Sequence, residues 1–247
     1  MFKHIRWQII LGLGLTTASV LLYLTQIEIF HKPHDTFFYL FQDLAFFPIQ
    51  VLLATLVLNE ILTAREKIGK MKKIYMIIGI FFSETGTELL KKLTGFDQEC
   101  LRIRDHLLVK EHWTKAEFTL AGKKVQRHDC KIECPKQDFL MIKNLLAGKR
   151  ETILGLLQTP YLLEHETFTD LLLAVSHLTE ELSFRTDLDR LSEKDCQHLF
   201  GDIRRAYVLL ITEWLAYLKH LKENYPYLYS LALRTNPFDQ NASPAFK

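Results

Sequence analysis

The sequence predicts an all-α protein that joins an N-terminal transmembrane helical hairpin to a cytoplasmic helical bundle. Three observations support this fold class. Two apolar runs of membrane-spanning length lie within the first 62 residues. The rest of the chain has apolar residues at three- and four-residue spacings, and it has no convincing alternating strand pattern. The length of 247 residues suits one sizeable domain plus an accessory element.

The first apolar run covers about residues 8–27 and meets no charge until Glu28. A helix of this length spans about 30 Å at ~1.5 Å per residue, which is the thickness of the hydrocarbon core. The second run covers about residues 37–59, and the link between the runs is too short for a domain. A cleaved signal peptide is the alternative for the first run, but the run is long for one and no small-x-small cleavage pattern follows it.

The distribution of basic residues predicts the orientation of the hairpin. Lys3 and Arg6 precede the first run, and a basic cluster follows the second, where it would lie against anionic head groups. The positive-inside bias then places both termini in the cytoplasm of a multi-pass protein of the cell inner membrane, with the lipid bilayer as its first partner. The basic cluster consists of Arg65, Lys67, Lys70, Lys72 and Lys73.

Polar residues inside the runs raise a transport hypothesis. Asp43 and Gln50 lie in the second run on either side of Pro48, and a carboxylate within a membrane is a candidate for an ion pathway. Two spans cannot enclose a pore, so a channel or transport component requires an oligomer. Gly12 and Gly14 belong to a small-residue face on the first run, which favours close packing of the hairpin on itself or on a second copy. We therefore expect a homo-oligomer.

Helix signals follow in order along the remaining chain. Residues 74–82 are apolar but too short to span a membrane. Residues 97–113 have helical spacing, Thr114 with Glu117 has the spacing of a capping box, and Pro135 can begin a helix that ends near Gly148. Further helices are expected over residues 164–182, about 192–223 and 227–234.

These signals divide the chain into four parts. A hairpin precedes a basic juxtamembrane segment with an amphipathic helix, then a cytoplasmic helical domain, then a flexible tail. Their predicted ranges are residues 1–63, 64–96, 97–238 and 239–247.

Charge and motifs narrow the functional classes. Beyond residue 73 the chain holds 23 lysines and arginines against 24 aspartates and glutamates, so no basic excess suggests nucleic acid. The four cysteines are too few for a disulfide scaffold. No P-loop, G-x-G-x-x-G, G-x-S-x-G or H-E-x-x-H motif is present, and this absence favours a non-enzymatic role.

The segment EHETFTDLLLAVSHLTEEL, residues 164–182, carries the most chemistry. At 100° per residue its apolar side chains form one stripe, and a carboxylate–histidine stripe lies roughly 130° away and mostly faces water. His177 and Glu181 belong to that second stripe. His198 and Asp202 lie on the long helix near the edge of its core face, beside Asp195, whose spacing to His198 resembles the Glu-x-x-His unit of di-iron bundles.

Four residues therefore form a candidate metal site: His177, Glu181, His198 and Asp202. Imidazole and carboxylate together suit zinc, iron or manganese, provided that the two helices meet. The alternative is a polar seam of hydrogen bonds at i, i+4 spacing. His128, Cys130 and Cys134 form a weaker zinc candidate, because a second cysteine pair is missing.

Several long segments carry a resemblance to a known family. They are FPIQVLL, FFSETGTELL, EHETFTDLLLAV, HLTEEL and ENYPYLYSLALRTNPF. With these segments the chain resembles a family of uncharacterised prokaryotic membrane proteins. The resemblance implies two N-terminal spans and a helical cytoplasmic domain, and it assigns no catalytic residue.

We expect a membrane-tethered interaction, scaffolding or sensory module with a possible protein partner on the cytoplasmic side. A His/carboxylate metal-binding enzyme or sensor is the alternative, and an oligomeric channel or transport component is the second alternative.

Overall fold

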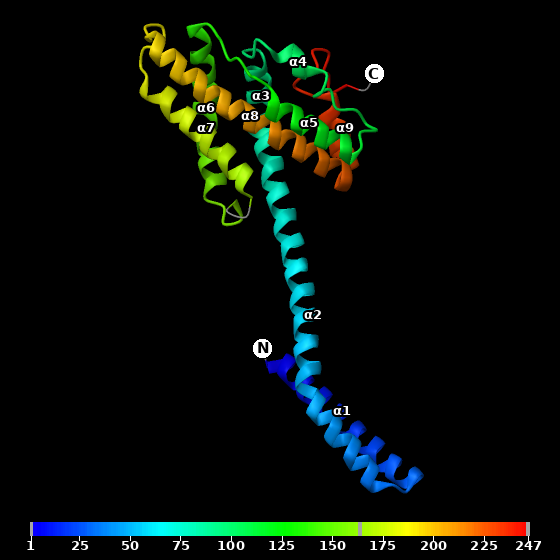
Figure 1. The fold of residues 1–247 in the computed structure, drawn as a ribbon. Coiled ribbons are helices and arrows are strands. Elements are labelled where there is room, and N and C mark those ends of the chain that lie inside the picture. Colours follow the sequence, from blue (N-terminus) through cyan, green and yellow to red (C-terminus); the bar gives the residue numbers. More distant parts are fainter. Residues whose placement is uncertain (1, 163–164, 246–247) are drawn as a thin grey trace. The chain divides into compact units, whose positions relative to one another are not determined.

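The computed structural model describes residues 2–162 and 165–245 (Figure 1). The side chains of residues 2–9, 11 and 33 lie outside this description, and so do the predictions that rest on Lys3, Arg6 and Glu164. Within the described residues the secondary structure is helical, apart from one isolated bridge between Asp97 and Ile132. The predicted all-helical class is confirmed.

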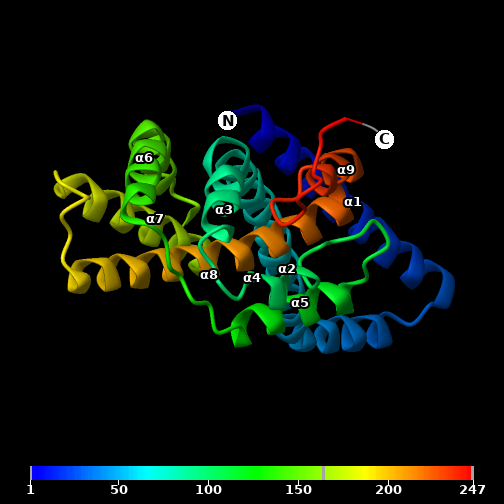
Figure 2. The same ribbon diagram turned by 90° about the horizontal axis from the view of Figure 1, so that it is seen from above.

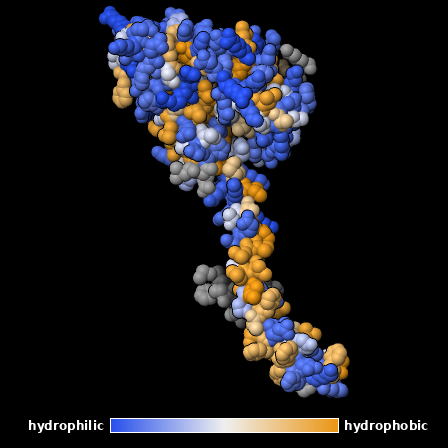
Figure 3. Space-filling model, in the orientation of Figure 1, coloured by the Kyte–Doolittle hydropathy of each residue, from blue (hydrophilic) through white to orange (hydrophobic). Residues whose placement is uncertain are grey.

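The chain forms two units, residues 1–66 and 67–247. The first unit holds α1 (Phe2–Phe30) and the first part of α2 (Pro33–Phe81). Figure 3 shows that mainly hydrophobic residues cover these helices, and their large apolar side chains are exposed. Two windows, within Gly12–Phe30 and within His34–Thr94, are long and apolar enough to cross a membrane by length and composition.

The helices of the first unit differ from the predicted ones in length. Only residues 31 and 32 separate α1 from α2, so the predicted nine-residue link is largely helical. Pro48 lies inside α2 without ending it. A Cβ added at Gly12 or Gly14 would meet nothing within 4 Å, so the predicted small-residue face does not pack within the described part of one chain.

The second unit begins with the C-terminal part of α2, which the sequence had assigned to a separate juxtamembrane segment. Ile74, Ile78 and Phe81 are buried in the same core as the later helices. Helix α2 then passes into a π-helical turn, η1 (Phe82–Gly86), and α3 (Thr87–Thr94). The structure therefore divides the chain at residue 67, close to the predicted boundary at residue 64, and it joins the predicted juxtamembrane segment to the later helices. Tyr75 and Phe82 contact α8, and Phe81 contacts α7.

Helix α8 (Glu193–Asn224) is the central element of the second unit (Figures 1 and 2). It packs against α3, α5, α7 and α9, while α6 packs against α7 and α3. The surrounding helices are α4 (Cys100–Arg104), α5 (Lys115–Arg127), α6 (Lys136–Leu157), α7 (Glu166–Phe184) and α9 (Pro226–Arg234). The predicted helix over residues 97–113 is reduced to the short α4.

Local sequence signals account for several helix ends. Thr114 and Glu117 form the predicted capping box at the start of α5. Ser192 caps α8 by accepting a hydrogen bond from the Asp195 backbone N–H. The expected end near Gly148 is wrong, because α6 continues to Leu157 and buries Ile153 and Leu156 beyond the glycine.

Candidate metal site

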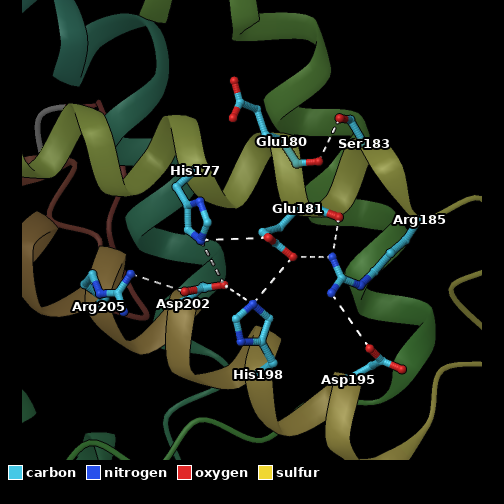
Figure 4. Close-up of polar contacts among 9 residues, drawn as sticks. All are labelled: His177, Glu180, Glu181, Ser183, Arg185, Asp195, His198, Asp202 and Arg205. Carbon is cyan, nitrogen blue, oxygen red and sulfur yellow. Dashed lines mark hydrogen bonds and ion pairs between the residues drawn. The ribbon is translucent and has the colours of Figure 1, made fainter.

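Helices α7 and α8 bring the four predicted metal ligands together (Figure 4). Helix α7 presents Leu178 and Leu182 to the core, and α8 presents Leu199 and Ile203. These apolar contacts set the register of the two helices. The polar residues beside them, His177 and Glu181 on α7 and His198 and Asp202 on α8, then point toward one another.

The Asp202 carboxylate lies at the centre of the cluster. Its Oδ2 atom is 3.4 Å from His198 Nε2 and 3.6 Å from His177 Nε2. His177, His198 and Asp202 each offer a ligand atom within 4.8 Å of the others. Glu181 flanks this triad, with Oε2 3.5 Å from His198 Nε2 and Oε1 4.0 Å from His177 Nε2.

Burial differs sharply within the cluster. The Asp202 side chain is 4% exposed, whereas the two histidines are 44% and 53% exposed. Arg205 lies 3.3 Å from Asp202 Oδ1, but the buried Oδ2 atom has no hydrogen-bond donor. A buried carboxylate oxygen without a donor is costly, so this atom calls for a cationic or donating partner.

Arginine and serine partners complete the surroundings of the triad. Arg185, the C-cap residue of α7, donates from Nη1 to Glu181 Oε2 and to the Glu181 backbone carbonyl. This hydrogen bond and the guanidinium charge lower the pKa of Glu181, and the neighbouring histidines lower it further. Hydrogen bonds from Ser192 lower the pKa of Asp195, which faces Arg185 at 3.9 Å.

The structure changes two expectations about this site. The carboxylate–histidine stripe of α7 was expected to face water, but α8 lies beside its C-terminal half and leaves Glu181 25% exposed, while His177 stays 44% exposed. Glu166 and Asp170 in the N-terminal half are exposed, as expected. The Asp195 carboxylate accepts a hydrogen bond from the Ser192 hydroxyl and faces the Arg185 guanidinium. It lies outside the ligand triad, so the likeness to a Glu-x-x-His unit is not supported.

A second cluster joins Asp97, His128 and Cys130, and its geometry contrasts with the first. Asp97 Oδ2 is 2.7 Å from His128 Nε2, and its Oδ1 accepts hydrogen bonds from the backbone N–H groups of Glu99 and Lys131. Burial raises the pKa of the Cys130 thiol to about 12, so the thiol stays protonated. Cys134 does not join this cluster, and the saturated Asp97 instead holds two loops together.

Two residues that shape the chemistry, Arg185 and Arg205, were not predicted from the sequence, and neither was the contact that Glu213 makes. Arg185 lies at i, i+4 from Glu181, and Arg205 lies at i, i+3 from Asp202, so both spacings were readable in the sequence. Glu213 is 2% exposed and accepts a hydrogen bond from the Thr167 hydroxyl, while its Oε2 atom has no donor. No periodicity signals that contact, because Thr167 belongs to another helix.

The remaining predicted residues lie outside this cluster. Asp43 and Gln50 are exposed on α2. Of the basic cluster, Lys70 is half-buried and the other members are exposed. Lys73 Nζ donates to the Tyr161 hydroxyl at 2.9 Å and lies 4.6 Å from the centre of that ring.

Comparisons with known proteins place the chain in a family. Residues 70–234 match the family described as "Uncharacterized protein MJ1433, C-terminal helical domain", and residues 2–62 match "MJ1433, N-terminal helical domain". The chain is 44% identical over 237 residues to "Uncharacterized protein MJ1433" of Methanocaldococcus jannaschii, covering 96% of this chain and 95% of that relative. No solved structure matches the chain. The resemblance found in the sequence is thus confirmed as to family, and the chain belongs to the MJ1433 family, whose members combine an N-terminal and a C-terminal helical domain.

Proposed function

We propose that the protein is a membrane-anchored sensory module whose C-terminal helical domain binds a divalent transition-metal ion between α7 and α8. One observation carries the metal half of this proposal. Asp202 Oδ2 is buried without a hydrogen-bond donor, and two imidazole nitrogens lie 3.4 and 3.6 Å from it.

The two separations measured from Asp202 Oδ2 are compatible with a tetrahedral ion. Ligand atoms at the corners of a tetrahedron with metal bonds of ~2.0–2.1 Å lie about 3.3 Å apart. Direct hydrogen bonds between imidazole and carboxylate would instead bring the atoms to about 2.8 Å. The separations of Asp202 Oδ2 from His177 and His198 therefore suit a shared ion better than two direct hydrogen bonds.

The ligand types favour zinc, iron or manganese. Two imidazoles and one carboxylate form a mixed nitrogen and oxygen set, which suits these metals. The exposure of His177 and His198 leaves the site open to solvent, so an ion could exchange and a water or Glu181 could complete its coordination. Exchange with solvent is what a sensor requires.

Arg185 offers a route from the ion to the rest of the domain. It holds Glu181, and its backbone carbonyl accepts a hydrogen bond from Lys143 Nζ of α6 at 2.7 Å. Coordination of an ion by Glu181 would weaken the bond to Arg185 and loosen the segment that joins α7 to α8. A protein partner on the cytoplasmic side would read this change.

The anchoring half of the proposal rests on the first unit. Its apolar side chains are exposed, and the hydroxyls of Thr16, Thr17 and Thr25 in α1 and Thr55 in α2 donate to backbone carbonyls of their own helices. Internal bonding of hydroxyls suits a medium without water. We infer two spans in the inner membrane with both termini in the cytoplasm, and Gly12 and Gly14 free to pack on a second copy.

Metal analysis of the full chain, purified without a histidine tag, tests the proposed metal binding. Plasma mass spectrometry should find about one zinc, iron or manganese ion per chain, falling below about 0.2 in His177→Ala and in His198→Ala. His112→Ala, which changes an exposed histidine in a turn outside the cluster, is the matched control. Metal-free wild-type protein after zinc loading, or loss of the ion in Cys130→Ser instead, contradicts the proposal.

Cysteine labelling in cells tests the anchoring half independently. Cys100→Ser and Cys134→Ser first remove the two half-buried thiols. A membrane-impermeant maleimide should then label His34→Cys in intact cells, and it should label Asn241→Cys only after permeabilisation. Extraction of the protein by alkaline carbonate, or the opposite labelling pattern, would refute this topology.

A further inference from the structure

A cavity of about 600 Å³ lies within the second unit between the C-terminal turns of α2 and α8 and the first turn of α9. This volume falls in the range of small-molecule sites. Most of its wall consists of aromatic and aliphatic side chains: Tyr75, Met76, Ile80, Tyr217, Leu221, Tyr225 and Leu228.

The apolar wall is open to solvent. Met76 is 65% exposed and Ile80 is 46% exposed on neighbouring turns of α2, and Leu228 of α9 is 37% exposed opposite them. A concave apolar surface of this kind is a candidate binding site for a ligand. The cavity needs an apolar occupant.

Close packing fixes the shape of the wall. A Cβ added at Gly79 would lie 3.1 Å from the Tyr217 hydroxyl, so the glycine lets Tyr217 lie against α2. Tyr217 also stacks on Phe82 with ring centroids 5.4 Å apart. The ring of His220 stacks on Tyr75 at 3.7 Å. These contacts hold the aromatic side chains in place and pre-form the cavity.

His220 contributes a polar group to the wall. Its Nδ1 atom accepts a hydrogen bond from the Asn224 side-chain amide at 3.3 Å, which leaves the proton on Nε2 in the neutral ring. Nε2 is buried and has no hydrogen-bond partner.

The lining of the cavity has basic side chains but no acidic ones. Lys72 and Lys73 are its lysines, and its lining contains no aspartate or glutamate. The two carboxylates whose charges act on Tyr75 are Glu213 and Glu223, and both are engaged elsewhere. Glu213 is bonded to Thr167, and Glu223 pairs with Lys115 at 3.2 Å. An anionic group at the lysine end is therefore favoured.

We propose that this cavity binds an acyl chain of an anionic lipid, whose head group pairs with Lys72 and Lys73. An apolar hollow with cations at one end complements an amphiphile that has a charged head and an apolar tail. The two lysines also end the basic cluster that follows the second apolar run, which is where anionic lipid would be encountered. This site is independent of the metal site, and no residue is shared between them.

Photocrosslinking of the full chain in phosphatidylcholine vesicles tests the proposal. The probe is a trace of phosphatidylglycerol with a diazirine near the end of one acyl chain. Peptide mapping should find adducts within residues 74–83 and 217–228 of the wild type. Met76→Trp and Ile80→Trp should fill the cavity and remove these adducts, whereas Leu173→Trp, a 53% exposed leucine of α7, should leave them unchanged.

A charge reversal tests the head-group contact. Lys72→Glu should lower the adduct yield in the cavity by about fivefold or more, and Lys124→Glu on α5 should not. Adducts confined to residues 8–59, or an equal yield from a phosphatidylcholine probe, would overturn the lipid assignment. Loss of a chain dimer in Met76→Trp without any lipid adduct in the wild type would instead assign the cavity to a second copy, and would equally overturn it.

Discussion

Two buried aspartates show how the partners of one carboxylate decide its role. Asp97 receives hydrogen bonds on both oxygens from His128 and two backbone N–H groups. Asp202 is equally buried but keeps one oxygen without a donor between two exposed histidines. The first arrangement is a saturated structural contact, and the second is an incomplete one that a metal ion would complete.

The same substitution should therefore affect different properties at the two positions. Asp97→Asn should lower the free energy of unfolding by about 3 kcal/mol, because it leaves a buried hydrogen-bond network broken. Asp202→Asn should change the stability of chelator-treated protein by less than about 1 kcal/mol while lowering metal affinity by about tenfold or more. Thermal unfolding with and without a chelator measures both. Equal destabilisation of the chelator-treated variants would contradict the distinction.

Glu213 should make stability depend on pH. Burial raises its pKa above the usual value of 4.5, against the opposing hydrogen bond from Thr167. The folded state then binds a proton more tightly than the unfolded state, so stability falls as pH rises from 4.5 through the raised pKa. Glu213→Gln removes this loss, since an amide carries no charge to bury.

The comparison of this variant with the wild type is best made as a function of pH. Glu213→Gln should be more stable than the wild type at neutral pH, and the difference should vanish as pH falls toward about 4.5. Chemical denaturation at several pH values measures the difference. A constant difference, or one that grows on acidification, would show that Glu213 is charged in the folded protein.

At the scale of elements, local signals predicted beginnings better than endings. Thr114 with Glu117 and Ser192 were readable as helix starts because a cap is a local hydrogen bond. Gly148 was misread as an end, since a glycine inside a helix costs only about 1 kcal/mol and burial of Ile153 beyond it outweighs that cost. The extension of α2 to Phe81 likewise depends on tertiary burial of its last turns.

The glycines of the second unit make a direct test of packing against propensity. A Cβ added at Gly86 in η1 would lie 2.7 Å from Phe81 and 2.8 Å from Phe82, so Gly86→Ala should destabilise the protein by about 1–3 kcal/mol. Gly122 of α5 has nothing within 4 Å of that position, and Gly122→Ala should stabilise by up to about 1 kcal/mol. Denaturant titration measures both changes, and a neutral Gly86→Ala would contradict the packing described for η1.

At the scale of the whole molecule, the sequence predicted the residues of the site better than the helix packing that brings them together. Helical arithmetic placed His177 with Glu181 and His198 with Asp202, because each pair lies on one helix. It could not show that α8 packs beside that part of α7, or that Asp202 becomes the buried member, since both depend on which helices pack together. The inclusion of residues 74–96 in the same core as the later helices was missed for the same reason.

Anomalous diffraction detects directly whether a metal ion lies between the Asp202 carboxylate and the two histidines, as the proposed function requires. Crystals of the full chain grown with zinc, measured at the zinc edge, should show a peak about 2.0–2.2 Å from His177 Nε2, His198 Nε2 and Asp202 Oδ2. A map without a peak there, with the imidazoles hydrogen-bonded directly to Asp202, or with zinc bound only at Asp97, would contradict the account.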